Sequence, residues 1–229
     1  MASWDAVLFD CDGVLVDSEV VGLEESARFL RDRGFSFSAE EIIRRYTGKR
    51  DDRFREELVQ DYADVLGRAP DEEESEALFE GMIAARRAAK HTMQAVPGAA
   101  QSVRAAIAAD CRVAVASSSK QAFLDSKVER FGLKPLFGEH VYSADIVSQG
   151  KPAPDIFLYA ADRLGTDPAS CLVIEDSVYG VEAALAAGMQ AFGFTGGGHC
   201  FGGHGDRLLA VGAAKVLPSH AALQQELTP

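Results

Sequence analysis

The stretch LFDCDGVLVDS, residues 8–18, places three aspartates directly after an apolar run. The segment AVLFD at 6–10 is short and β-rich, which predicts a buried strand that ends at Asp10. Asp12 follows two residues later, so two carboxylates are held close together where the chain leaves the strand. Like charges at that spacing raise each other's pKa unless something compensates them. The stretch therefore predicts a compact acidic site that needs a cation.

Four further apolar segments also end in polar residues, as strands of one sheet would. They are VAVASSS at 113–119, LVIEDS at 172–177, AFGFT at 191–195 and a weaker HVYSA at 140–144. Helical patterns lie between most of them, and this alternation indicates βαβ units. We therefore predict an α/β protein with a doubly wound, parallel, Rossmann-like sheet. Ligands bind such sheets at the carboxyl ends of the strands, which carry Asp10, Ser117, Glu175 and Asp176.

Residues 19–90 interrupt this alternation, because they carry only helical signals. Ser38 and Glu41 have the spacing of a capping box, and a long amphipathic segment runs from 51 to 67. We predict an α/β core domain made of residues 1–16 and 93–229, and a smaller all-helical cap domain made of residues 17–92.

The composition excludes several classes of partner. The chain of 229 residues has a formal net charge of −12, which repels a phosphodiester backbone and an anionic membrane surface. We expect no nucleic acid and no membrane as partners, and the first residues predict neither a signal peptide nor a membrane span. The four cysteines form no CxxC pair and suit free thiols in a reducing compartment. We expect a cytoplasmic protein that is a monomer or a weak homodimer.

Four motifs occur in a characteristic order: Asp-x-Asp at 10–12, ASSS at 116–119, KPAPD at 151–155 and VIEDSVYG at 173–180. Together they resemble the haloacid dehalogenase superfamily, specifically its Mg-dependent phosphatase and β-phosphoglucomutase-like branch with a helical cap. The resemblance covers nearly the whole chain. It implies phosphate chemistry that depends on Mg²⁺, which hard carboxylate oxygens bind well.

The resemblance implies a role for each residue of the first motif. Asp10 would be the nucleophile that forms an aspartyl-phosphate, which divides one difficult displacement into two easier ones. Asp12 would be the general acid and base, because it protonates the leaving alcohol and then takes a proton from the hydrolytic water. Gly13 would let the backbone turn tightly beside the substrate phosphate.

The second and third motifs are similar to the phosphate-binding segments of the family. Ser117 would hydrogen-bond the phosphoryl oxygens, and Ser118 follows it at a helix N-terminus, which is an anion site. One of the three serines could instead be a helix cap. Lys151 would balance the charge of Asp10 and of the phosphate.

The metal ligands implied by the resemblance come from the first and fourth motifs. They are Asp10, the peptide carbonyl of Asp12, Asp176, and Glu175, which either binds Mg²⁺ directly or orients the ligands. Asp176 could also be an N-cap of the helix that follows, and the two roles are compatible. Gly180 would permit close packing of that helix on the strand.

Substrate selection would fall to the cap, where the stretch RRYTGKRDDR at 44–53 concentrates positive charge. Lys49 and Arg50 would face Asp10 and bind an anionic or hydroxyl-rich group, and a solvated helix face is the alternative. The leading hypothesis is a phosphomonoesterase that acts on a small sugar, sugar-acid or polyol phosphate, 6-phosphogluconate among them.

Other activities on the same scaffold are less well matched. Dehalogenases and phosphonate-cleaving relatives lack an aspartate two residues after the nucleophile, and this chain has Asp12 there. A β-phosphoglucomutase-like sugar phosphomutase is the alternative, although EVVGLEE at 19–25 lacks the histidine of that family. A non-catalytic binder of a phosphorylated ligand is the third hypothesis.

The segment TGGGHCFGGHGD at 195–206 holds His199, Cys200 and His204. It offers three candidate metal ligands without a rigid spacing, so we expect a mobile loop rather than a transition-metal site. The isolated His91, His140 and His220 carry no pattern and are expected to be incidental.

Overall fold

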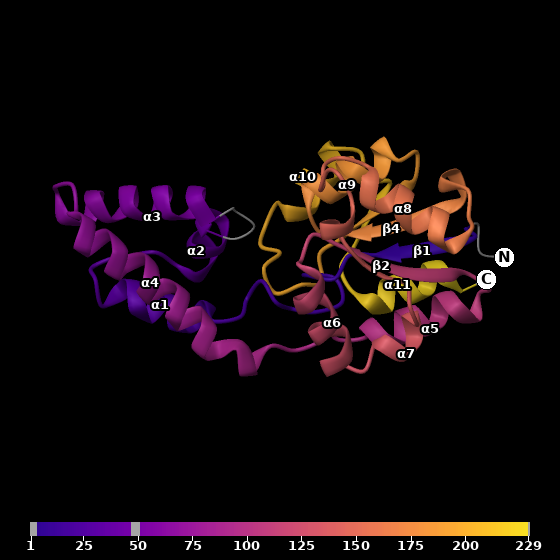
Figure 1. The fold of residues 1–229 in the computed structure, drawn as a ribbon, viewed down its shortest axis with the longest axis horizontal. Coiled ribbons are helices and arrows are strands. Elements are labelled where there is room, and N and C mark those ends of the chain that lie inside the picture. Colours follow the sequence, from indigo (N-terminus) through magenta and orange to yellow (C-terminus); the bar gives the residue numbers. More distant parts are fainter. Residues whose placement is uncertain (1–3, 47–50, 229) are drawn as a thin grey trace. The chain divides into compact units, whose positions relative to one another are not determined.

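The computed structural model describes residues 4–46 and 51–228. The chain divides into two compact units, one made of Met1–Asp17 with Gln94–Pro229 and the other of Ser18–Met93 (Figure 1). The division falls one residue after each boundary predicted from the sequence. In the described part of the chain, no helix combines the length and the apolar composition that a membrane span requires.

The larger unit is built on a parallel six-stranded sheet. Its strands are β1 (Ala6–Phe9), β2 (Arg112–Ser117), β3 (Val141–Ser143), β4 (Cys171–Glu175), β5 (Gln190–Phe194) and β6 (Lys215–Leu217). They pair in the order β3-β2-β1-β4-β5-β6, and each pair is parallel. The predicted doubly wound α/β fold is confirmed, and β6 is a strand that the sequence pattern did not reveal.

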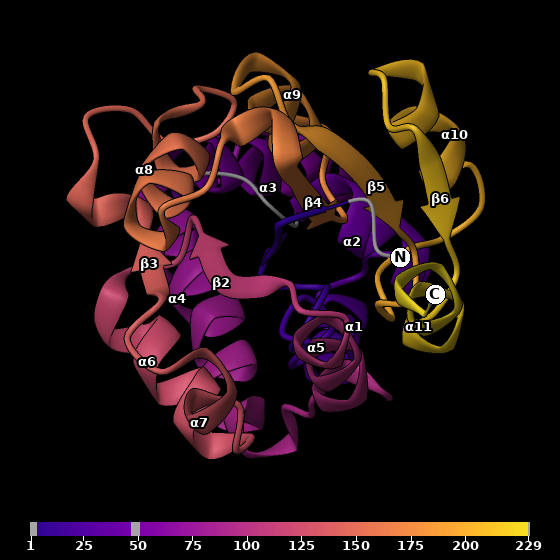
Figure 2. The same ribbon diagram turned by 90° about the vertical axis from the view of Figure 1, so that its right-hand side faces the viewer.

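Helices cover both faces of this sheet. They are α5 (Ala99–Ala108), α6 (Gln121–Arg130), α7 (Lys134–Phe137), α8 (Asp155–Leu164), α9 (Val178–Ala186), α10 (His204–Ala210) and α11 (His220–Leu227), with 3-10 turns at Ala144–Ile146 and Pro168–Ser170. Figure 2 shows α8, α9 and α10 on one face and α5, α6, α7 and α11 on the other. Because β1 and β4 are covered on both sides, every residue in these two strands is buried, as parallel strands require.

The order of the strands fixes the position of the site. From β1 the chain proceeds to β2 on one side, and it later returns to β4 on the other side of β1. Such a reversal leaves a crevice at the carboxyl ends of the two strands. Phe9 lies in register with Ile174, and the amide of Asp10 donates to the carbonyl of Ile174 at 3.0 Å. Asp10 and Glu175 therefore leave the sheet side by side.

The described residues of the second unit form helices joined by turns and loops, without a strand. It contains α1 (Leu23–Arg31), α2 (Ala39–Tyr46), α3 (Asp51–Leu66), α4 (Glu72–Ala88) and a 3-10 turn at Ala89–Thr92. The predicted capping box begins α2, because Ser38 Oγ accepts from the amide of Glu41 at 3.2 Å and the Glu41 carboxylate accepts from the amide of Ser38 at 2.8 Å. A buried apolar cluster joins the four helices; it includes Leu30, Ile42, Phe54, Leu58, Leu78 and Met82.

Candidate active site

Asp10 is the first residue after β1 and only 6% of its surface is exposed. Its Oδ1 accepts a hydrogen bond from the Lys151 ammonium at 2.5 Å. The same ammonium donates to Glu175 Oε1 at 2.6 Å and to the carbonyl of Ala116 at 2.9 Å. One buried lysine thus joins the ends of three adjacent strands, β2, β1 and β4.

The electrostatics of this centre are dominated by burial. Desolvation raises the pKa of the Asp10 carboxyl well above its ordinary value, the Lys151 charge opposes the rise, and the neighbouring Glu175 and Asp176 add to it. Burial by itself lowers the pKa of Lys151, but the contacts with Asp10 and Glu175 outweigh burial and raise it. The carboxylates here outnumber the single ammonium, so the donor set suits one more cation with a preference for oxygen ligands.

Glu175 ends β4 and uses both of its carboxylate oxygens. Oε1 accepts from Lys151, while Oε2 accepts from the amide of Ser177 at 3.0 Å and from its hydroxyl at 2.9 Å. Gly180 is required beside it, because a Cβ built on Gly180 would lie 1.8 Å from Glu175 Oε1. The predicted close approach of α9 to the strand therefore takes place at the Glu175 carboxylate.

Asp176 follows Glu175 and is buried. Its Oδ2 lies 2.9 Å from His199 Nε2, and its peptide carbonyl lies 2.6 Å from His204 Nε2, close enough to accept a hydrogen bond. The helix-cap alternative for Asp176 is wrong, because the N-cap of α9 is Ser177, whose hydroxyl accepts from the amide of Gly180 at 3.0 Å.

Asp12 is held by Ser119, which follows β2, and by Lys127, which lies in α6. The Ser119 hydroxyl donates to Asp12 Oδ2 at 2.6 Å, and the Lys127 ammonium is paired with Asp12 Oδ1. Lys127 also donates to Ser119 Oγ at 2.9 Å. Burial lowers the pKa of Lys127, but the charge of Asp12 and the hydrogen bond to it, together with Cys11 and Asp10, outweigh burial and raise this pKa. The second aspartate of the first motif therefore has its own ammonium partner.

The serines after β2 do not act as the cap of α6. The N-cap position is Lys120, whose side chain makes no capping hydrogen bond, so the cap interpretation of the serines is wrong here. The first amide of the helix, that of Gln121, donates to Asp145 Oδ2 at 3.0 Å instead. Ser117 is buried and its Oγ accepts from the amide of Ser119 at 3.1 Å, whereas Ser118 is exposed.

Gly13 continues the turn after Asp12 with φ of +79°, a conformation that L side chains rarely adopt. A Cβ built there would lie 1.9 Å from Asp176 Oδ2 and 2.6 Å from His199 Cε1. The glycine therefore keeps the first turn in close contact with the end of β4 and with the loop after β5.

The structure gathers most of the predicted site residues at the carboxyl ends of β1, β2 and β4, and it adds others. Asp10, Lys151, Glu175 and Asp176 meet at the ends of β1 and β4, while Lys49 and Arg50 lie outside the described residues. The sequence did not predict Ser119 and Lys127 as contacts of Asp12, or His199 as a contact of Asp176. Ser119 and His199 stood in segments already singled out, but a lysine inside an amphipathic helix gives no such signal.

Comparisons with known proteins agree on a family. A family model described as "Hydrolase: haloacid dehalogenase-like hydrolase" matches residues 4–188. The bifunctional riboflavin kinase/FMN phosphatase of Arabidopsis thaliana is 38% identical over 185 residues, which cover 80% of this chain and 46% of that protein. The chain thus spans less than half of this relative. The 6-phosphogluconate phosphatase of Escherichia coli is 25% identical over 199 residues, which cover 87% and 86% of the two chains.

Solved structures share the whole fold. A haloacid dehalogenase family hydrolase from Deinococcus radiodurans, crystallised with bound phosphate and sodium, is 37% identical and superposes with a TM-score of 0.85. The match covers 100% of both chains.

Proposed function

Because the chain belongs to the haloacid dehalogenase-like hydrolase family, we propose that it is a Mg²⁺-dependent phosphomonoesterase for a small sugar, sugar-acid or polyol phosphate. The observation that carries the proposal is the buried Asp10 carboxylate, paired with Lys151 at the end of β1. Relatives whose names describe a 6-phosphogluconate phosphatase and an FMN phosphatase support hydrolysis of a phosphate monoester.

Asp10 is the nucleophile in this proposal. Its carboxylate oxygen attacks the phosphorus, an O–P bond to Asp10 forms, and the bond from phosphorus to the substrate oxygen breaks. Water then attacks the phosphorus of the aspartyl-phosphate, which releases inorganic phosphate and restores the carboxylate. Lys151 contacts the carboxylate throughout and offers its charge to the phosphoryl oxygens.

Asp12 is the proton carrier. It gives a proton to the leaving alkoxide in the first step, and as a carboxylate it accepts one from the attacking water in the second. Ser119 and Lys127 fix its position, and the charge of Lys127 favours the carboxylate form that the second step requires. Ser117 and Ser118, at the end of β2, are the proposed hydrogen-bond donors to the phosphoryl oxygens.

The residues present fit Mg²⁺. Asp10, the carbonyl of Asp12 and Asp176 would hold the ion, and its charge would offset the negative charge of the phosphate and the carboxylates. Glu175 suits the orienting role better than direct ligation, because both of its oxygens already accept hydrogen bonds from Lys151 and Ser177.

The helical unit is the proposed cap that selects the substrate, with Lys49 and Arg50 as its candidate binding residues. Free thiols throughout the chain suit the cytoplasm, and we place the protein there as a monomer or a weak homodimer. The partner is then a small phosphorylated metabolite.

Hydrolysis of an aryl phosphate tests the proposal directly. We expect turnover that requires Mg²⁺ and is abolished in Asp10→Asn, whereas Asp5→Asn, on an exposed aspartate just before β1, should keep it. A panel of phosphorylated sugars and sugar acids then identifies the substrate class. Activity that Asp10→Asn retains would refute the nucleophile, and activity seen only with a sugar bisphosphate primer would establish the mutase alternative.

A further inference from the structure

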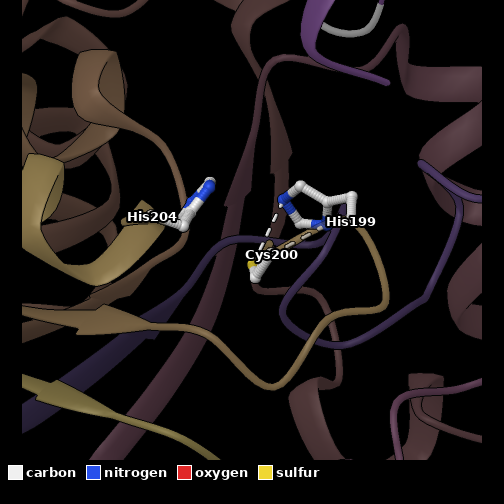
Figure 3. Close-up of side chains that lie close together, drawn as sticks. All are labelled: His199, Cys200 and His204. Atoms are coloured by element: carbon white, nitrogen blue, oxygen red, sulfur yellow. Dashed lines mark hydrogen bonds between the residues drawn. The ribbon is translucent and has the colours of Figure 1, made fainter. Parts of the chain in front are cut away.

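Three side chains with nitrogen or sulfur ligands gather in the loop between β5 and α10. His199 is buried, Cys200 is partly buried, and His204 is the first residue of α10. One ligand atom from each lies within 4.8 Å of the other two, and Figure 3 shows the three side chains around a common space. The spacing of these residues in the sequence favours a loop without a metal. The fold nevertheless brings the side chains of His199, Cys200 and His204 together.

The distances are close to those of a zinc site. Zinc bond lengths of about 2.3 Å to sulfur and 2.0–2.1 Å to nitrogen place tetrahedral ligand atoms about 3.5 Å apart. Cys200 Sγ lies 3.5 Å from His199 Nε2. His204 has to approach by about 1.3 Å at most to complete the set.

Hydrogen bonds within the glycine-rich loop and to Asp17 hold the loop in place. The amide of Gly198 donates to Asp17 Oδ1 at 3.0 Å, and the amide of Cys200 donates to the carbonyl of Gly197 at 3.1 Å. A Cβ on Gly197 would lie 2.7 Å from the carbonyl of Gly13 and 3.0 Å from His199 Nδ1. The loop thus packs against the turn that follows β1, which limits the positions of His199.

We propose that His199, Cys200 and His204 form a second cation site, selective for a borderline ion such as Zn²⁺, beside the carboxylate centre. Nitrogen and sulfur ligands select such ions over Mg²⁺, which prefers oxygen. The ion binds as three protein ligands with water in the remaining position, and the Cys200 thiol releases its proton to solvent.

His204 has to give up one hydrogen bond in order to bind. Its Nε2 donates to the carbonyl of Asp176 at 2.6 Å, and its Nδ1 accepts from Arg207 at 3.1 Å. Arg207 is exposed, so the guanidinium can turn to solvent at small cost. If Nδ1 of His204 binds the ion, its Nε2–H keeps the hydrogen bond to the Asp176 carbonyl. A hydrogen bond of this kind commonly orients a metal-bound histidine.

Asp176 connects the second site to the first. His199 Nε2 lies 2.9 Å from Asp176 Oδ2 and gives up this contact when it binds the ion. The ion then stands next to a carboxylate that the proposed function assigns to Mg²⁺. Two divalent cations that both lie beside the Asp176 carboxylate repel each other. Zn²⁺ at the second site therefore weakens Mg²⁺ binding, a consequence that rests on the proposed function.

Absorption of Co²⁺, which replaces Zn²⁺ in such sites, tests the site without any assay of activity. Tag-free protein is saturated with Mg²⁺ and titrated with Co²⁺. We expect one equivalent to give a thiolate charge-transfer band in the near ultraviolet and d–d bands of a four-coordinate ion, and Zn²⁺ to abolish both.

Variants identify the ligands. The charge-transfer band should vanish in Cys200→Ser and persist in Cys111→Ser, whose thiol donates to the carbonyl of Trp4 instead. His204→Ala should weaken Co²⁺ binding at least about tenfold. No band in the wild-type protein, or a band that Cys200→Ser retains, overturns the site.

The coupling to Mg²⁺ has a separate readout. Zn²⁺ should raise the Mg²⁺ concentration needed for half-maximal hydrolysis in the wild-type protein and in Cys111→Ser, but not in Cys200→Ser. If the Co²⁺ spectrum appears and no hydrolysis is found, the proposed function fails while the site stands. Equal Mg²⁺ requirements with and without Zn²⁺ would overturn the coupling alone.

Discussion

His220 should make the stability of the core unit depend on pH. It begins α11, is fully buried, and its Nε2 donates to the carbonyl of Val14 at 2.7 Å, directly behind the turn that carries Asp12 and Gly13. Its ring packs on Phe194 with 4.6 Å between centroids. His220, which carried no pattern in the sequence, therefore has a structural role in the core unit.

Burial lowers the pKa of His220 from 6.5 to about 4, and the hydrogen bond to Val14 opposes part of the shift. Because the unfolded chain binds the proton more readily, this contribution to stability is complete above pH 6.5 and is lost as the pH falls toward 4. A shift of 2.5 units corresponds to about 3 kcal/mol in total, and about 2 kcal/mol of it is already lost at pH 5.

Urea unfolding at pH 7 and at pH 5 measures this loss. Trp4 is the only tryptophan, and its indole donates to Gln190 in the core unit, so its fluorescence reports unfolding of that unit. His220→Gln keeps a hydrogen-bond donor and removes the titration. We expect the variant to be less stable at pH 7 but to lose about 2 kcal/mol less than the wild-type protein between the two pH values.

Other groups that titrate between pH 5 and pH 7 contribute equally to the wild-type protein and to His220→Gln, so their contributions cancel in the comparison. His91→Gln is the matched control, because His91 is exposed, and it should reproduce the wild-type pH dependence. If His220→Gln loses the same free energy as the wild-type protein between pH 7 and pH 5, the buried neutral histidine is not the cause.

Three further substitutions test the site. Lys127→Met should lower kcat at least about tenfold and shift the acidic limb of the pH–rate profile by about 1–3 units to higher pH, because Asp12 loses the nearby charge. Lys134→Met, on a half-exposed lysine that pairs with Asp125, should do neither. Lys151→Met should abolish hydrolysis and lower the free energy of urea unfolding by about 3–5 kcal/mol, because it leaves buried carboxylates unpaired. Gly13→Ala should abolish Mg²⁺ binding in calorimetry, because its Cβ would collide with a carboxylate.

The sequence predicted the centre of the sheet better than its edge. The segments that became β1, β2 and β4 are apolar runs that end in polar residues, and burial on both faces is what produces such runs. The edge strand β6 has three residues and two of them are partly exposed, so its pattern is too short to recognise. The helices α10 and α11 flank this strand and were missed with it.

Some residues of the candidate site could likewise be predicted from the sequence, and others could not. Asp10, Glu175 and Asp176 could be located because each stands at the end of a strand or directly after it, and the neighbouring strands then bring them together. Lys127 lies inside α6, where a lysine normally faces solvent. Only the packing of that helix beside β3 places its ammonium on Asp12, a contact between residues 115 positions apart.

Two aspartates separated by one residue are tolerated here because each has a lysine of its own. Lys151 reaches Asp10 from the segment before α8, and Lys127 reaches Asp12 from α6, so the two ammonium groups approach the first motif along different elements. The sequence alone had suggested that a shared metal ion compensates both carboxylates. With Asp12 paired to Lys127, the negative charge that remains in excess comes from Asp10, Glu175 and Asp176 around Lys151. The proposed Mg²⁺ therefore belongs at the junction of β1 and β4, where this excess of negative charge lies, and the proton transfers proposed for Asp12 take place beside it.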